Sequence, residues 1–183
     1  MDANTLVASL QDALPGAPIE GVPSVDLQTT IYVSREDLPA IARTLRDRSG
    51  LAFNLLAEIT AVDFWPREPR FELVYILVSI PNRLRLRMKV RLSGADPRVA
   101  TMSGVWPAAN WLEREVWDLF GISFDGHPDP RRLLMPEDWE GYPLRKDYPV
   151  QIKMTPQTSQ PLQVTEDEFR ANLMKDRLTR GSP

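Results

Sequence analysis

Two kinds of hydrophobic pattern divide the first 120 residues into strands and helices. Alternating or short apolar runs predict four strands, at Leu27–Val33, Leu55–Phe64, Phe71–Ile80 and Leu84–Leu92. Apolar residues three or four apart predict helices at residues 3–13, about 37–48 and about 107–120. Pro81-Asn82-Arg83 is typical of a turn, so the last two strands should form an antiparallel hairpin. This order is typical of an α+β fold, a mixed or antiparallel sheet of about four strands with helices packed on it.

Proline and glycine mark the segments between and after these elements. Pro18–Pro23 is predicted to be a linker, and Asp96–Thr101 interrupts the hydrophobic pattern before the last helix. Five prolines between Pro128 and Pro149 prevent regular helix or strand there. Residues 113–149 therefore combine the second half of a helix with a Pro-rich irregular segment. Such a segment is fixed only by its own side chains or by a surface that it lies against.

The chain after Pro149 differs in composition from the part before it. Residues 151–163 are polar, contain two prolines and lack hydrophobic periodicity, which indicates an extended arm. Thr165–Glu168 has the form of a helix capping box, and Phe169 and Leu173 would share one side of a terminal helix. We therefore expect an α+β domain at residues 1–149 and an extended arm at residues 150–183. By composition alone, this arm either frays or docks on another chain.

One predicted strand carries a basic residue at every second position. These residues are Arg83, Arg85, Arg87, Lys89 and Arg91. A period of two puts the cations on one face of a sheet and the apolar residues between them on the other. The basic face would either dock on an acidic partner, as in a free adaptor protein, or be a solvated surface. In the second case cross-strand acids such as Glu72, Glu58 or Asp63 would relieve the repulsion.

Composition narrows the class of protein. The 183 residues are 43% hydrophobic and 26% charged, as in ordinary soluble globular proteins. A formal net charge of −3 argues against nucleic-acid binding. The longest apolar run, Leu73–Ile80, is too short to cross a bilayer, and the N-terminus lacks the features of a secretory or organelle signal. We expect a bacterial cytoplasmic protein that is attached to a membrane only through a partner.

The chain has no cysteine and a single histidine, His127. Without thiolates it cannot supply the usual ligands of an iron–sulfur cluster, a structural zinc site or a disulfide. One histidine also leaves it without the paired histidines of most zinc or non-haem iron sites. If the protein works in a redox enzyme, we expect its neighbours to hold the metals.

The stretch from Glu113 to Pro149 carries a detailed resemblance to a known family. Its distinctive charged and histidine positions are Glu113, Arg114, Glu115, Asp118, His127, Arg131, Arg145, Lys146 and Asp147. With Leu119, Phe120 and the pair Leu133-Leu134, this spacing resembles the signature of the C subunit of the proton-pumping NADH–quinone oxidoreductase, respiratory complex I. The similarity is strongest over about Ala52–Asp63 and Val99–Pro149. Many positions of unlike chemistry have to coincide in it, which makes it specific.

The resemblance implies a non-catalytic structural subunit in the peripheral arm of that enzyme. It implies no catalytic, cofactor-binding or metal-binding residue in this chain, and a role in assembly for the signature residues. In that family FMN and iron–sulfur clusters belong to partner subunits, while NADH and quinone are substrates of the complex. The implied partners are a D-type subunit at the quinone pocket and a B-type subunit with the terminal iron–sulfur cluster. The implied location is the cytoplasmic face of the bacterial inner membrane.

Other functions stay open at this point. Equivalent subunits occur in complexes linked to plastoquinone, to coenzyme F420 or to hydrogenase, because other chains read the electron donor. A stand-alone metal-dependent hydrolase would use Glu115, Asp118 and His127. Glu113 and Glu115, however, diverge by roughly 200° on a helix and cannot face one ion together.

A structural role for the same charges predicts ion pairs between the helix and the irregular segment. Arg114 is placed to pair with Asp118, one helical turn away. The other expected pairs join Arg131, Arg132 or Arg145 to Glu113, Glu115, Asp118 or Asp147. His127 stands between Gly126 and Pro128, and we expect it to be a hydrogen-bonded turn residue.

Overall fold

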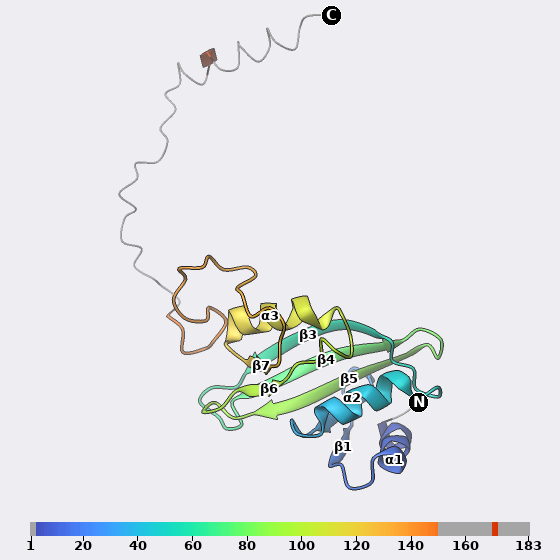
Figure 1. Cartoon of the computed structure of the whole chain (residues 1–183). Coiled ribbons are helices and arrows are strands. Elements are labelled where there is room, and N and C mark those ends of the chain that lie inside the picture. The colour runs from blue at the N-terminus through green and yellow to red at the C-terminus, as the bar shows by residue number, and fades with distance from the viewer. Residues whose placement is uncertain (1–2, 150–169, 172–183) are drawn as a thin grey trace, which may run out of the picture. The chain divides into compact units, whose positions relative to one another are not determined.

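The computed structural model describes residues 3–149 and 170–171 of the chain (Figure 1). The helices are α1 (Ala3–Ala13), α2 (Leu38–Asp47) and α3 (Ala109–Phe120). The strands are β1 (Ile19–Val22), β2 (Thr30–Val33), β3 (Leu55–Asp63), β4 (Phe71–Ser79), β5 (Leu84–Leu92), β6 (Arg98–Ala100) and β7 (Ser123–Asp125). All of them belong to one compact unit, Met1–Tyr148. The predicted arm, with its capping box at Thr165–Glu168, lies outside the described residues except for Arg170 and Ala171.

The larger sheet has the order β1-β2-β5-β4-β3 within the described chain. Strands β4 and β5 pair antiparallel from Phe71↔Leu92 to Ser79↔Leu84, and β3 pairs antiparallel with β4. Strand β2 joins β5 in parallel and β1 joins β2 antiparallel, so the sheet is mixed. The predicted hairpin turn at Pro81-Asn82-Arg83 is confirmed, as is the α+β fold.

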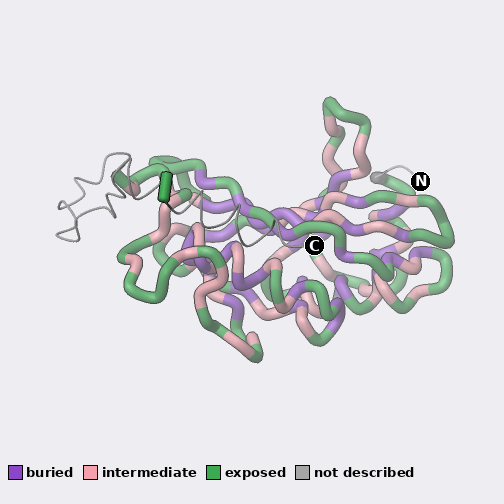
Figure 2. Tube along the Cα trace, turned by 90° about the horizontal axis from the view of Figure 1, so that it is seen from above, coloured by how far each residue is buried: buried purple, intermediate pink, exposed green. Residues whose placement is uncertain are grey.

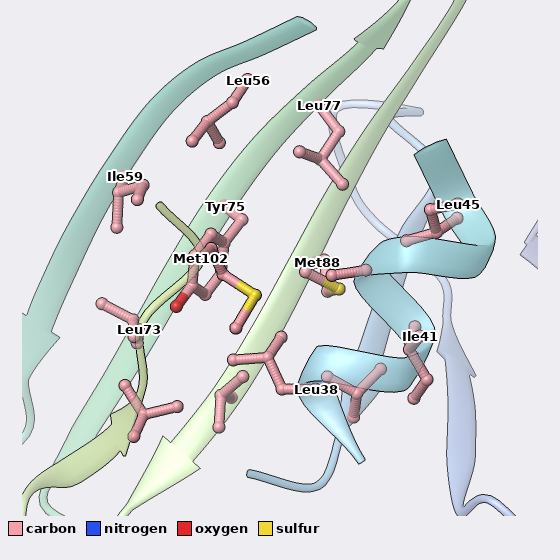
Figure 3. Packing of buried hydrophobic residues seen from close by; sticks show 14 of the residues in the cluster. Leu38, Ile41, Leu45, Leu56, Ile59, Leu73, Tyr75, Leu77, Met88 and Met102 are labelled. Atoms are coloured by element: carbon pink, nitrogen blue, oxygen red, sulfur yellow. The ribbon is translucent and has the colours of Figure 1, made fainter. Parts of the chain in front are cut away.

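Helices α2 and α3 cover the same face of this sheet (Figure 1). Alternate residues of the two central strands, all with no exposed surface, supply that face: Leu73, Tyr75, Leu77, Leu86, Met88 and Val90. Leu38, Ile41 and Leu45 of α2 lie over them beside Met88 (Figure 3). Because burial of each such side chain is worth about 1.5–3 kcal/mol, this layer is the main source of stability.

The opposite face of the sheet carries the predicted basic residues, and acids neutralise most of them. The ion pairs are Lys89 with Glu72, Arg87 with Asp26 and Arg91 with Glu20. The hydroxyl of Tyr32 also donates to Glu72, at 2.5 Å. Of the expected acids, Glu72 takes this role, whereas Asp63 pairs with Arg70. The alternation of buried and exposed positions along the sheet can be followed in Figure 2 and corresponds to a solvated, nearly neutral face.

Two predictions at the start of the chain are wrong. The expected linker Pro18–Pro23 contains β1, which is too short to show a pattern and lies at a sheet edge, where neighbouring prolines are tolerated. The expected strand Leu27–Val33 begins only at Thr30. Leu27 has a φ of 58°, and this left-handed conformation ends an extended run.

A second sheet pairs β6 with β7 in parallel, from Arg98↔Ser123 to Ala100↔Asp125. Strand β6 lies inside the predicted break Asp96–Thr101, and three residues are too few for an alternating pattern to reveal either strand. The pairing joins the chain just after α3 to the chain just before it. It therefore fixes where the following segment begins.

Helix α3 ends at Gly121, as the sequence predicts. The φ of Gly121 is 70°, a left-handed value that glycine adopts readily, and its N–H donates to the carbonyl oxygen of Trp117 at 2.8 Å. A Cβ atom here would collide with the Tyr142 ring and with the Arg145 guanidinium. The helix end and residues 142–145 are therefore packed without room for a side chain.

Candidate functional site: the irregular segment on helix α3

Residues 126–149, called the irregular segment below, contain no helix or strand in the described structure. The centre of their attachment is Asp118 of α3, which is fully buried. Its Oδ2 accepts the backbone N–H groups of Leu133, Leu134 and Met135 at 3.1, 2.7 and 2.8 Å. Burial raises the pKa of Asp118, but these N–H groups and Arg132 outweigh it and lower the pKa below its usual value.

Arg132 completes this attachment. Its Nη1 donates to Oδ1 of Asp118 at 2.6 Å, and its Nη2 donates to the carbonyl oxygen of Trp139 at 2.9 Å. The guanidinium lies 5.5 Å from the Trp117 ring and 5.9 Å from the Tyr142 ring. One side chain thus joins the helix to two distant points of the irregular segment, and the predicted pair of Arg132 with Asp118 is confirmed.

Arg114 also binds the irregular segment, but not in the predicted way. Its Nε and Nη2 donate to the carbonyl oxygens of Arg131 and Arg132, at 3.0 and 2.9 Å. Its Nη1 lies 3.3 Å from the carboxylate of Asp129. The expected pair with Asp118 is wrong, because the oxygens of Asp118 are occupied by Arg132 and by the backbone. Arg131 pairs with Asp129 as well, at 2.7 Å.

Arg145 holds the end of α3 rather than a carboxylate. Its Nε donates to the carbonyl oxygen of Phe120 at 2.5 Å, and its Nη2 donates to that of Gly121 at 3.2 Å. These carbonyls lie past the last helical hydrogen bond and would otherwise lack protein donors. The expected ion pair is therefore wrong for Arg145. Burial, together with the nearby Arg70, lowers the pKa of Arg145 from its usual value.

Asp63, at the end of β3, fastens the last part of the irregular segment. Its carboxylate pairs with Arg70 at 2.9 Å and accepts the backbone N–H groups of Lys146 and Trp65, both at 2.9 Å. Arg70 in turn pairs with Asp147 at 2.7 Å. Burial raises the pKa of Asp63, but these donors outweigh it and hold the pKa at about 2. Sequence reasoning did not recognise Asp63 or Arg70 as part of the site.

Glu113 lies on the sheet side of α3 and is fully buried. Its carboxyl accepts the backbone N–H of Met102 at 2.6 Å and the hydroxyl of Thr101 at 2.5 Å. Burial raises the pKa of Glu113 to about 7. Glu115, two residues on, is half-buried and makes no hydrogen bond or ion pair with any described residue. The two acids therefore diverge on the helix, as expected.

His127 is hydrogen-bonded at both ring nitrogens. The backbone N–H of Asp129 donates to Nδ1 at 3.0 Å, so Nδ1 carries no proton. Nε2 therefore carries it and donates to the carbonyl oxygen of Asn110 at 3.0 Å. The carboxylate of Glu113 is farther away, at 3.8 Å. His127 thus acts as a neutral residue that holds the turn after β7 against α3.

The residues of the alternative hydrolase site do not come together. Asp118 is occupied by the irregular segment, His127 by Asn110 and Asp129, and Glu115 by neither. Within residues 3–149 and 170–171 no group of three or more histidine, cysteine, aspartate or glutamate side chains could hold a metal ion. The arrangement binds peptide groups instead, and its effect is to fix an irregular segment on a folded domain.

None of the described helices is long and apolar enough to cross a membrane.

Comparison with known proteins gives the class to which this fold and segment belong. Residues 31–153, more than half of the chain, match the family of the 30 kDa subunit of the respiratory-chain NADH dehydrogenase. The chain therefore belongs to this family, and the resemblance carried by the signature residues is confirmed.

Two relatives make the comparison more specific. The C subunit of the NADH-quinone oxidoreductase of Roseiflexus sp. (strain RS-1) is 47% identical over 150 residues, which cover 82% of this chain and 86% of the relative. The protein of the same name from Geobacter metallireducens (strain ATCC 53774 / DSM 7210 / GS-15) is 54% identical over 125 residues, which cover 68% and 76%.

Two solved structures share the fold. The trypsin-resistant fragment (1-134) of Nqo5 is 34% identical with a TM-score of 0.56, covering 70% of this chain and 99% of that one. A chain of the membrane-bound sulfane sulfur reductase, an archaeal respiratory membrane complex, is 28% identical with a TM-score of 0.66, covering 80% and 85%. The second of these is part of a respiratory complex in a membrane.

Proposed function

We propose that this chain is a structural subunit in the peripheral arm of a proton-translocating NADH–quinone oxidoreductase and carries no catalytic residue itself. Membership of the 30 kDa subunit family supports the assignment to this enzyme. So does the identity of 47% and 54% with two proteins named as its C subunit. The likeness to a sulfane sulfur reductase chain is weaker, at 28%, so NADH is the donor that we propose.

One observation carries the structural role: the charged signature side chains bind peptide groups of their own chain. Asp118 accepts three backbone N–H groups, Arg114 donates to two carbonyl oxygens, and Arg145 donates to two more. A general acid or base has to present its proton or lone pair to a substrate within hydrogen-bond reach. Side chains with this bonding are instead suited to holding a surface in one shape for a neighbour.

The proposal extends to the partners and cofactors. Iron–sulfur clusters need thiolates, of which this chain has none, so FMN and the clusters would belong to partner subunits. The chain would brace the quinone module against a D-type partner and lie near a B-type partner with the terminal cluster. It would be peripheral on the cytoplasmic face of the bacterial inner membrane, with residues 1–149 as its domain and 150–183 as its arm.

Within this proposal the signature residues act in assembly rather than in electron transfer. They are Glu113, Arg114, Glu115, Asp118, His127, Arg131, Arg145, Lys146 and Asp147. Lys146 takes part through its backbone N–H, and Glu115 is left with its carboxylate directed at solvent or at a partner.

Affinity purification of the tagged chain from its native membranes in mild detergent, followed by mass spectrometry, tests the proposal. We expect flavin, iron–sulfur and quinone-pocket subunits to be recovered together with NADH:quinone oxidoreductase activity. Recovery of subunits that read another electron donor would reassign the chain to a related complex. Recovery of the chain alone would contradict the proposal.

A further inference from the structure

A cavity of about 130 Å³ lies between α3 and the chain around β7, and it leads to the buried carboxyl of Glu113. Its other polar wall residues are Arg114, Ser123 and His127. At about 30 Å³ per water molecule in the liquid, it has room for about four non-hydrogen atoms. Sites for cofactors and other small molecules span roughly 300–1,000 Å³, so this cavity takes something as small as the end of one side chain.

Glu113 has no cation beside it in the described structure. Its oxygens accept hydrogen bonds only from neutral donors, the N–H of Met102 and the hydroxyl of Thr101. His127 is 3.8 Å away and neutral, since the N–H of Asp129 occupies its Nδ1. A buried carboxylate without a positive partner is costly to ionise. The raised pKa of Glu113, about 7, expresses this cost.

Tyr75 adds no positive charge to this environment. It faces Glu113 from β4, it is fully buried, and its hydroxyl has no hydrogen-bond partner among the described residues. Burial and the charge of Glu113 together raise the pKa of Tyr75 well above its usual value, so it stays neutral. The carboxyl of Glu113 therefore faces neutral groups from α3, β4 and the chain after β7.

The remaining walls suit an aliphatic chain. Trp117, Phe124 and Pro130 are the apolar wall residues. Arg114 also lines the cavity, but its guanidinium is held by Asp129, at 3.3 Å, and by two carbonyl oxygens of the irregular segment. Its charge is thus neutralised on the side away from Glu113. An occupant with methylene groups along its length and one positive group at its tip would satisfy both the walls and the floor.

We propose that this cavity receives the side chain of one lysine from a neighbouring subunit, with its methylene groups against Trp117 and Phe124 and its ammonium at Glu113. This inference rests on the proposed function, because it needs a partner chain. The ammonium is compact, whereas an arginine would bring a planar group with five N–H donors that this small cavity cannot satisfy. A buried pair of this kind gives register and orientation to a docked partner.

The isolated full-length chain allows a direct test, because His127 is its single histidine and gives one resolved imidazole resonance by NMR. The probe is n-butylammonium, which has the length and charge of a lysine side chain, and n-butanol is the uncharged control. At about pH 8 we expect a saturable shift of the His127 resonance with butylammonium. Binding of butanol should be at least about tenfold weaker, and binding of butylammonium should weaken at about pH 5.5, where Glu113 is protonated.

Glu113→Gln is the matched variant for this titration, since it keeps the shape of the side chain and removes the charge. Loss of butylammonium binding in Glu113→Gln, with an unchanged spectrum elsewhere, supports the proposal. Equal binding of butanol and butylammonium, or equal binding by the variant, would overturn it.

A second experiment tests the partner in the native complex. Glu113→Gln removes the charge, Ser123→Leu fills the cavity, and Glu115→Gln is the control because it lies outside the cavity on the same helix. We expect both cavity variants to lower the recovery of partner subunits several-fold at raised salt, and the control to leave it unchanged. Unchanged recovery in both cavity variants would overturn the lysine proposal. If the wild-type chain recovers no partner, the proposed function itself fails, whatever the butylammonium titration gives.

Discussion

Asp118 and Arg132 form an ion pair at 2.6 Å in which the carboxylate has no exposed surface. Asp118 lies on α3 and Arg132 on the irregular segment, so the pair crosses from one to the other. With the three N–H groups that Asp118 also accepts, four donors converge on one carboxylate. The irregular segment therefore depends on a single negative charge.

Replacing Asp118 with asparagine should destabilise the chain by about 3–5 kcal/mol, the usual cost of breaking a buried ion pair. The amide keeps the shape but turns an N–H₂ group either toward Arg132 or toward the three backbone N–H groups. Urea unfolding of the isolated chain measures the loss. Asp47→Asn is the control, since Asp47 pairs with Arg46 at 2.6 Å but is exposed, and it should have little effect. Equal losses in the two variants would argue against the buried pair.

Arg145→Ala should reduce the amount of assembled complex more than its turnover. The substitution removes the donors to the carbonyl oxygens of Phe120 and Gly121, so the end of α3 and the irregular segment separate. Native gels would measure assembly, and NADH oxidation per assembled complex would measure turnover, which should stay within about twofold. Normal assembly with low turnover would contradict the structural role. Lys146→Ala is the matched control for thermal stability, because Lys146 binds Asp63 only through its backbone.

The stability of the chain should fall as the pH rises from about 4.5 to about 7 because of Glu113. Its pKa is about 7 in the folded chain against the usual 4.5, so over this range the folded state keeps a proton that the unfolded state has released. At about pH 8 the loss from this group should be roughly 3 kcal/mol. The opposite effect of Asp63, whose folded pKa is about 2, falls below pH 4 and leaves this window clear.

Urea unfolding of wild type and Glu113→Gln at several pH values measures this contribution as a difference. The variant should lack the decline between about pH 4.5 and 7, so the two curves should converge at low pH and separate at high pH. Parallel curves would mean that Glu113 ionises normally in the folded chain.

Gly121→Ala should lower the free energy of unfolding by at least about 1–3 kcal/mol. An alanine would have to adopt the φ of 70° and would place its Cβ against Tyr142 and Arg145. Gly50→Ala is the control, since nothing lies within 4 Å of a Cβ there and its φ is not left-handed. Thermal unfolding of both variants gives the comparison, and an unchanged melting temperature in Gly121→Ala would contradict the tight packing at the end of α3.

Sequence patterns predicted the long elements of the fold and failed on the short ones. Nine-residue strands such as β4 and β5 show enough alternation to be recognised, whereas β1, β6 and β7 have three or four residues. The fifth strand of the main sheet was missed for this reason. The pairing of β6 with β7 depends on the path of the chain around α3, on which local periodicity carries no information.

At the site, sequence predicted the important side chains but often the wrong partners. Helical spacing suggested that Arg114 would pair with Asp118, and opposite charge suggested a carboxylate for Arg145. An irregular segment, however, has many peptide groups without secondary-structure partners, and these must be satisfied when they are buried. Backbone donors and acceptors are the same in every sequence, so no pattern of residue types reveals which of them Asp118, Arg114 and Asp63 bind.

The irregular segment is gripped mainly through its peptide groups, and this separates the residues that hold it from the residues that it displays. Asp118 and Asp63 recognise N–H groups that residues of almost any type would offer at positions 133–135 and 146. Leu134 and Leu144 are 60% and 52% exposed. These outward side chains can be exchanged to suit a different neighbour while the attachment stays the same. The segment is thus a surface whose chemistry can diverge between assemblies without any change in the scaffold beneath it.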